Sequence, residues 1–161
     1  MTRPTDFRAL IETLTAASVD FIVIGGIAAA VRGSARATLD LDVVYGRTND
    51  NLERLTRALV PLTPYLRGAP PGLPFTLDEA TLRRGLNFTL DTSLGALDLL
   101  GEVTGGGTFE QLKPFTTVID LFGKPCRVVT LDKLIALKRA AGRPKDLEAV
   151  AELELLRDRE R

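Results

Sequence analysis

The stretch from Phe21 to Val44 constrains the fold of this chain more than any other part of its sequence. An apolar strand leads into the glycine pair Gly25-Gly26, a short helix of small residues follows, and a second strand carries Asp40 and Asp42. Side chains alternate between the two faces of a strand, so the two carboxylates share one face. They repel each other unless a cation lies between them or water surrounds them. Beside a glycine turn that a phosphate can approach, the pair suggests metal-assisted chemistry on a nucleotide.

Length and composition limit the classes of protein that fit. A chain of 161 residues predicts a single domain spanning 1–161. Lys and Arg balance Asp and Glu at 21 each, which argues against a broad nucleic-acid surface but is compatible with a local basic cluster. The chain has no histidine, which excludes Ser-His-Asp triads, imidazole bases and His-ligated zinc. Proton transfer and metal binding therefore fall to carboxylates, lysine, tyrosine or water.

The sequence also predicts the cellular compartment of the protein. The single cysteine, Cys126, cannot form an internal disulfide and fits a reducing cytoplasm. The N-terminus lacks the apolar segment of a signal peptide, and the longest apolar stretch, 19–31, is too short and too interrupted to span a bilayer. We therefore expect a cytoplasmic protein without a membrane partner.

Hydrophobic periodicity and turn signals predict an α+β fold with a mixed β-sheet and helices against it. Prolines and glycines make 61–76 a surface loop. Asp91–Ser93 is expected to form the turn of a hairpin. The expected helices span 6–17, 27–31, the segment after a cap at 48–50, 109–112, 131–141 and 145–157. The expected strands span 20–24, 38–45, 86–90, 94–100, 116–121 and 127–129.

A third acid interrupts the apolar strand at 94–100. Asp98 lies on the face opposite Leu97 and Leu99, where a carboxylate is costly unless it is paired, hydrated or bound to a metal. Asp91 and Glu102 are competing candidates for the same role. An acid at an exposed strand end is the alternative interpretation, as a solvated strand face is for Asp40 and Asp42 and a simple tight turn is for the glycine pair.

Basic residues near the C-terminus are the remaining candidates. Lys138 continues the apolar stripe of the helix at 131–141, so it points inward or extends its ammonium outward along its stem. Arg143 and Lys145 lie at the start of the next helix, where they could grip a phosphate or an acceptor, or be solvated loop charges. Asp146 is explained by the helix dipole alone.

These residues resemble the DNA polymerase β-like nucleotidyltransferase superfamily. Its signature is an apolar strand, Gly-Gly or Gly-Ser, a helix, then Asp-x-Asp, with a third carboxylate on a later strand. Here thirteen residues separate Gly25-Gly26 from Asp40-Leu41-Asp42, and 36–42 is similar to the Arg-x-Thr-x-Asp-x-Asp form of small prokaryotic members. The segments 131–138 and 142–147 are similar to the C-terminal part of the toxin-type members. The resemblance covers roughly 19–156. It departs at Gly26, where many members carry serine, and at Arg32, where relatives often carry histidine.

The resemblance implies a nucleotidyltransferase fold and a Mg²⁺-dependent (or Mn²⁺-dependent) enzyme that moves an NMP from an NTP onto an acceptor hydroxyl. It makes Asp40, Asp42 and Asp98 the catalytic metal ligands. The implied nucleotide-binding residues are Gly25, Gly26, Ser34, Arg36, Thr38, Lys138 and Arg143.

Several functional readings stay open at this point. The toxin-type likeness implies RNA, especially tRNA, or protein as acceptor, with an antitoxin as a possible partner. Transfer to a small antibiotic uses the same chemistry. A catalytically weak nucleotide-binding module of a toxin–antitoxin pair is the alternative outside enzymology. The position of Asp98 distinguishes the enzyme from the binding module, because an Asp98 side chain that points away from Asp40 and Asp42 favours the binding module.

Overall fold

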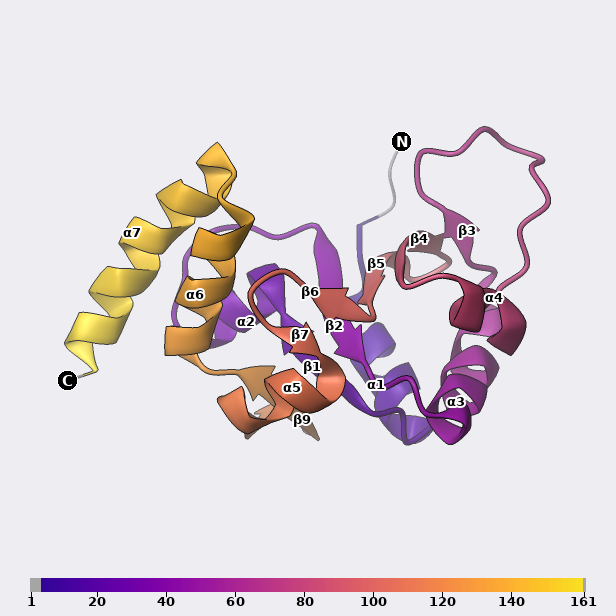
Figure 1. Cartoon of the computed structure of the whole chain (residues 1–161), viewed down its shortest axis with the longest axis horizontal. Helices are drawn as coiled ribbons and strands as arrows, with labels where there is room; N and C mark the ends of the chain where they lie inside the picture. Colours follow the sequence, from indigo (N-terminus) through magenta and orange to yellow (C-terminus); the bar gives the residue numbers. More distant parts are fainter. Residues whose placement is uncertain (1–3, 161) are drawn as a thin grey trace.

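The computed structural model of the protein describes residues 4–160. These residues form a seven-stranded mixed sheet in the order β3-β4-β5-β2-β1-β9-β8, with helices packed around it (Figure 1). A two-stranded ribbon, β6-β7, lies beside it. The strands are β1 (Phe21–Ile24), β2 (Asp40–Tyr45), β3 (Tyr65–Leu66), β4 (Asn87–Thr92), β5 (Gly95–Leu100), β6 (Glu102–Val103), β7 (Gly107–Thr108), β8 (Thr116–Leu121) and β9 (Lys124–Val129). The helices are α1 (Phe7–Ala16), α2 (Gly25–Val31), α3 (Asn49–Leu59), α4 (Glu79–Arg84), α5 (Phe109–Leu112), α6 (Leu131–Ala141) and α7 (Pro144–Arg159), with 3-10 turns η1 (Val60–Leu62) and η2 (Lys113–Phe115). The predicted α+β class with a mixed sheet is confirmed.

The centre of the sheet decides where the acids lie. Strand β2 runs antiparallel to β1 and parallel to β5, and Asp42 is in register with Ile24 on one side and Asp98 on the other. Residues in register across a ladder face the same side, so the carboxylates of β2 and β5 share one face of the sheet. The opposite face presents Leu41 and Leu97, which are fully buried.

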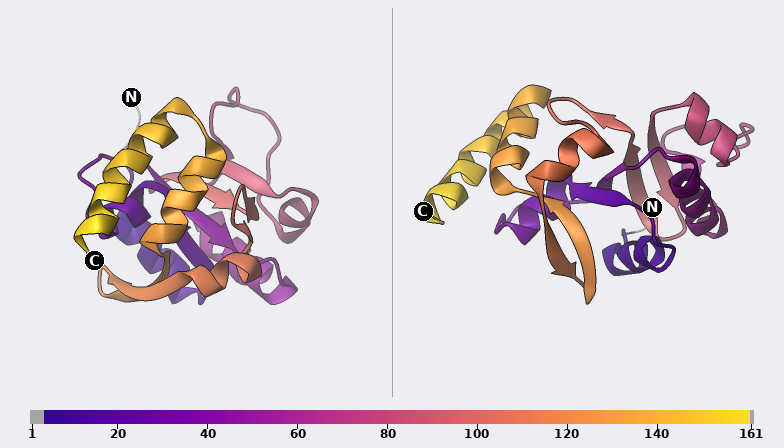
Figure 2. Two further views of the ribbon diagram at one scale, coloured as in Figure 1. Left: turned by 60° about the vertical axis from the view of Figure 1, so that its left-hand side comes forward. Right: turned by 60° about the horizontal axis from the view of Figure 1, so that its bottom comes forward.

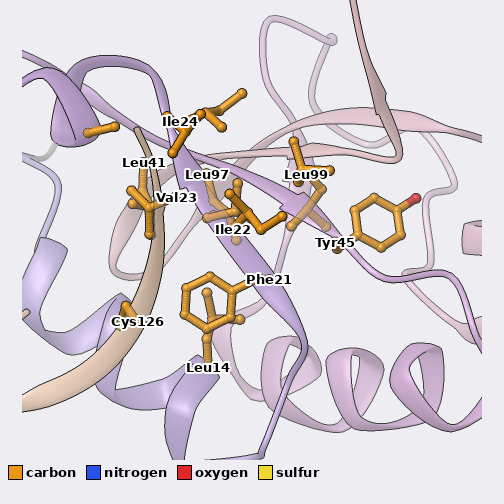
Figure 3. Close-up of a cluster of buried hydrophobic side chains, with 14 of the residues drawn as sticks. Leu14, Phe21, Ile22, Val23, Ile24, Leu41, Tyr45, Leu97, Leu99 and Cys126 are labelled. Carbon is orange, nitrogen blue, oxygen red and sulfur yellow. The ribbon is translucent and has the colours of Figure 1, made fainter. Parts of the chain in front are cut away.

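Helices α1 and α3 contribute leucine and isoleucine side chains to the core on that opposite face. Their fully buried members are Leu10, Ile11 and Leu14 of α1, and Leu52, Leu55 and Leu59 of α3. Figure 3 shows Leu14 beside Phe21, with Leu97, Leu99 and Tyr45 further along the same core. Each fully buried leucine stabilises the fold by about 2 kcal/mol relative to exposure. This core fixes β2 and β5 rigidly under the acids.

Helices α6 and α7 form an antiparallel pair at one end of the molecule (Figures 1 and 2). Thr130 caps the start of α6 by accepting a hydrogen bond from the Lys133 amide, and Gly142 ends it in the left-handed region, at φ 68°. Pro144 then occupies the first turn of α7, where a missing N–H costs nothing. The chain therefore reverses within a few residues, which brings the start of α7 next to the last turn of α6.

Several predicted boundaries are wrong by a few residues. Helix α2 starts at Gly25 rather than at 27, and strand β2 starts at Asp40 rather than at 38, so Thr38 lies outside the strand. The hairpin between β4 and β5 turns at Ser93-Leu94, because β4 continues through Asp91 to Thr92. Strand β9 starts at Lys124, and α7 continues to Arg159.

The proline-rich segment 61–76 is more than the predicted loop. It contains the end of η1 and the short strand β3, which extends the sheet by pairing Tyr65 with Asp91 and Leu66 with Leu90. In Figure 1 the chain between β3 and α4 forms a wide loop at the end of the molecule opposite α7. An edge strand in this segment places its next residue, Arg67, beside the acidic face of the sheet.

Within residues 4–160, no helix combines the length and the apolar character that crossing a membrane requires.

Candidate metal centre

Asp40, Asp42 and Asp98 converge at the surface of the sheet. One carboxylate oxygen from each lies within 4.8 Å of the corresponding oxygens of the other two, and all three side chains are half-buried. The convergence follows from the sheet register, since Asp42 pairs with Asp98 and Asp40 lies two residues before Asp42 on the same face. The predicted triad is therefore assembled in space.

One carboxylate oxygen in this cluster is shielded from water. Oδ1 of Asp98 is buried and forms an ion pair with Nη2 of Arg67, 2.9 Å away. The three carboxylates supply hard oxygen donors, which fit a Mg²⁺ or Mn²⁺ ion that binds carboxylates and keeps several waters.

The protonation of Asp42 reflects the crowding of negative charge. Burial raises the pKa of Asp42 to about 7, and the carboxylates of Asp98 and Asp40 contribute to the rise. Lys138 acts in the opposite direction. Without a cation the cluster therefore holds a proton near neutral pH, whereas a bound divalent cation would favour the fully ionised form.

Arg67 is a counter-charge that sequence reasoning missed. Its guanidinium lies 2.9 Å from Asp98, 3.1 Å from Asp91 and 3.5 Å from Asp40. It also donates a 2.6 Å hydrogen bond to the carbonyl of Leu90. Nothing in the composition of 61–76 distinguishes this arginine from a solvated loop charge, because its position depends on the unexpected strand β3.

The glycine pair is explained by close approach to the acids and their neighbours. A Cβ on Gly25 would overlap Oδ2 of Asp42 and lie 2.9 Å from its Cγ, and Gly25 has a φ of 67°. A Cβ on Gly26 would lie 2.5 Å from the Cβ of Thr38. Both positions exclude a side chain, so the backbone at the start of α2 can lie against β2.

Two hollows meet at the acidic cluster. The larger, of about 390 Å³, opens between the α2–β2 connection and α7. The smaller, of about 250 Å³, lies between α6 and the strands on the other side. Asp42, Asp98 and Lys138 line both. The predicted residues that line the larger hollow are Gly26, Ser34, Arg36, Thr38, Asp40, Asp42, Asp98, Lys138 and Arg143; Gly25 lines the smaller one.

Asp146 organises the basic side of the larger hollow. It is 1% exposed, accepts hydrogen bonds from Nε and Nη2 of Arg143, and lies 3.7 Å from Nζ of Lys138. These partners, chiefly Arg143, lower the pKa of Asp146. Its carboxylate also accepts a hydrogen bond from the Arg143 amide, which caps α7. The helix-dipole explanation from sequence therefore misses most of its role, because the pairing with Lys138 arises only where α7 folds back beside α6.

Ser34 and Arg36 lie further along the same hollow, and both are engaged. The Ser34 hydroxyl donates to Glu152 and accepts from the Arg36 amide. The Arg36 guanidinium lies 3.8 Å from Glu148 in an exposed pair, which contributes little to stability. Any anion bound here would compete with these two glutamates.

The two competing acids lie outside the cluster of three carboxylates. Asp91 belongs to β4, where it faces Ala96 rather than Asp98 in the register and is held by Arg67. Glu102 is exposed at the start of β6. Arg32, which departs from the expected histidine, donates to the carbonyls of Val128 and Val129 and so ties the end of α2 to β9. Asp98 therefore supplies the third carboxylate of the cluster.

A comparison with models of known protein families finds no match for this chain, and a comparison with curated proteins finds none either.

Proposed function

We propose that this protein is a divalent-cation-dependent nucleotidyltransferase with a nucleotidyltransferase fold, which moves an NMP from an NTP onto an acceptor hydroxyl. The observation that carries the proposal is the convergence of Asp40, Asp42 and Asp98 from two parallel strands within 4.8 Å of one another. The resemblance of 19–156 to that superfamily points to the same chemistry. Mg²⁺, or Mn²⁺, is the expected cofactor.

The reaction forms a bond between the acceptor oxygen and the α-phosphorus, and breaks the bond from the α-phosphorus to the oxygen that leaves with pyrophosphate. Bound divalent cations supply charge stabilisation for the attacking and leaving oxygens. Asp40, Asp42 and Asp98 would hold the cations. Asp98 orients the acceptor hydroxyl and takes part in removing its proton, since it borders both hollows.

The two hollows suit two substrates. In the larger one Lys138, Arg36 and Lys145 supply positive charge for a triphosphate. Ser34 and Arg143 contribute after anion binding draws them from Glu152 and Asp146. Gly25, Gly26 and Thr38 contribute close backbone approach rather than charge. The smaller hollow, which shares Asp98 with the larger one, is the proposed approach of the acceptor.

RNA, especially tRNA, or a protein side chain is the proposed acceptor, in a cytoplasmic protein that works as the toxin of a toxin–antitoxin pair. The assembled triad favours this enzyme over a catalytically weak binding module, because Asp98 faces Asp40 and Asp42. An antibiotic would occupy the same acceptor position. The acceptors differ in size, so one labelling experiment separates them.

The test incubates purified protein with each of four α-³²P NTPs, Mg²⁺, and total cellular RNA, total protein or hydroxylated antibiotics. We expect label in one acceptor fraction with the wild type. Asp42→Asn and Asp98→Asn remove a charge with little change of volume and should lower the rate at least about 100-fold. Glu102→Gln changes an acid outside the cluster and serves as the matched control.

Circular dichroism and thermal unfolding establish that each variant is folded before its rate is compared. Equal labelling by Asp42→Asn and wild type would overturn the assigned role of the cluster. Absence of label in every fraction, with all four nucleotides, would favour the binding module.

A further inference from the structure

Arg67 lies where a positive charge competes with a metal ion. Nη2 of Arg67 is 2.9 Å from Oδ1 of Asp98, and Nη1 is 3.5 Å from Oδ2 of Asp40. These are two of the three carboxylates of the candidate metal centre. A divalent cation on Asp40 and Asp98 must therefore share its ligands with the guanidinium or displace it.

Other contacts hold Arg67 in place independently of the triad. Its Nε donates to Asp91 at 3.1 Å, and Nη2 donates to the Leu90 carbonyl at 2.6 Å. Its backbone amide donates to the Thr89 carbonyl at 2.9 Å, which continues the ladder of β3. A guanidinium has five N–H donors in a planar fork. Arg67 can therefore release Asp40 and Asp98 while it remains bound to β4.

The carboxylates do not depend on Arg67 for their positions. The parallel pairing of β2 with β5 sets the spacing of Asp42 and Asp98, and Gly25 packs against Asp42 from the other side. Removal of the arginine charge therefore leaves the three acids assembled and takes away a competitor. Arg67 therefore competes with a metal ion for the carboxylates, whereas the sheet and Gly25 hold those carboxylates in position for it.

We propose that Arg67 is an exchangeable internal counterion: it offsets part of the negative charge of Asp40 and Asp98 in the cation-free protein, and a divalent cation replaces it on both. Asp91 and the Leu90 carbonyl retain the guanidinium at the edge of the site. The inference rests on the proposed function, because it concerns the same metal centre. Arg67 therefore raises the concentration of divalent cation that is needed to occupy the metal centre.

The test measures Mn²⁺ affinity directly, by electron paramagnetic resonance of free Mn²⁺ without nucleotide. Arg67→Met keeps the apolar stem but removes the charge, and it should bind Mn²⁺ about tenfold more tightly than wild type. Arg67→Lys keeps the charge without the fork and should fall between them. Arg83→Met is the matched control, since Arg83 pairs with Glu79 on α4 and Asn49 on α3, outside the cluster of three acids, and its affinity should equal that of wild type.

A second readout follows the wild-type side chain itself. In ¹⁵N-arginine-labelled protein, the Arg67 Nε–H signal, assigned by its loss in Arg67→Lys, should shift when Mg²⁺ is added. It should not shift in Asp98→Asn at the same concentration. This measurement also holds if Arg67→Met fails to fold.

The outcomes distinguish the counterion from the metal centre. Equal or weaker Mn²⁺ binding by Arg67→Met, or an Arg67 signal that ignores Mg²⁺ in a protein that binds it, overturns the counterion and leaves the metal centre standing. Absence of Mn²⁺ binding by both wild type and Arg67→Met overturns both proposals.

Discussion

Gly25 and Asp42 are so close that a Cβ on the glycine would overlap a carboxylate oxygen of the aspartate. Gly25 also has a φ of 67°, which strains any other residue. This contact couples the start of α2 to the acidic cluster, and makes the glycine a requirement of the candidate metal centre rather than only of a turn.

Gly25→Ala should therefore destabilise the protein by about 2–4 kcal/mol and abolish Mn²⁺ binding, because the backbone at position 25 strains alanine and its Cβ displaces the Asp42 carboxylate. Gly72→Ala is the matched control, since Gly72 has a φ of 88° and open space around it. It should cost only the strain, about 1 kcal/mol. Urea unfolding of both variants measures the difference. Equal losses would mean that Asp42 moves aside freely.

Gly26 and Thr38 form a second coupled pair. A Cβ on Gly26 would lie 2.5 Å from that of Thr38, so Gly26→Ser should cost about 1–3 kcal/mol. Thr38→Gly removes the obstructing atoms. The double variant should recover at least about 1 kcal/mol relative to the sum of the single variants, measured by a double-mutant cycle in urea. Strict additivity would contradict the contact.

The buried carboxylate of Asp146 forms ion pairs with two side chains, Lys138 and Arg143. Asp146→Ala should destabilise the protein by about 1–3 kcal/mol, since it removes a cap of α7 and the pairing of Arg143 and Lys138. The pKa of Asp146 is lowered in the folded protein, so its contribution is present above the unfolded value of about 4 and is lost as pH falls below it. Thermal unfolding measured from pH 7 to pH 3 should show that Asp146→Ala loses less stability at low pH than the wild type does. An equal loss of stability at low pH in the two proteins would contradict this role of Asp146.

The raised pKa of Asp42 predicts the opposite pH dependence. The folded protein keeps a proton that the unfolded chain releases, so between about pH 4 and about pH 7 the cation-free protein should lose stability as pH rises. Asp42→Asn should remove that part of the slope. Mn²⁺ affinity of the wild type should fall about tenfold per pH unit below pH 7, because the cation competes with the proton. A flat affinity from pH 7 to pH 5 would show that Asp42 is not a ligand.

Local sequence patterns predicted the acidic strand well, for a physical reason. Strand alternation places Asp40 and Asp42 on one face, and an acid within an apolar strand marked Asp98 before any pairing was known. The parallel pairing of β2 with β5 is non-local, so sequence alone left Asp91 and Glu102 as rivals. Only the register decides among them.

Arg67 and Asp146 show what local patterns cannot reach. Arg67 depends on a two-residue edge strand inside a proline-rich segment, too short to leave a periodic signal. Asp146 resembles any acid in a first helical turn, and its burial arises only from the tight reversal between α6 and α7. Ser34 was predicted to bind nucleotide, yet its hydroxyl is bonded to Glu152, a partner that lies over a hundred residues away.

The most direct measurement of the central claim is the anomalous scattering of Mn²⁺ in crystals of the wild-type protein soaked with the ion and an unreactive NTP analogue. The account predicts Mn²⁺ within about 2.5 Å of carboxylate oxygens from Asp40, Asp42 and Asp98. Ordered Mn²⁺ confined to other acids, or a fully soaked crystal in which the three carboxylates hold no ion, would contradict it.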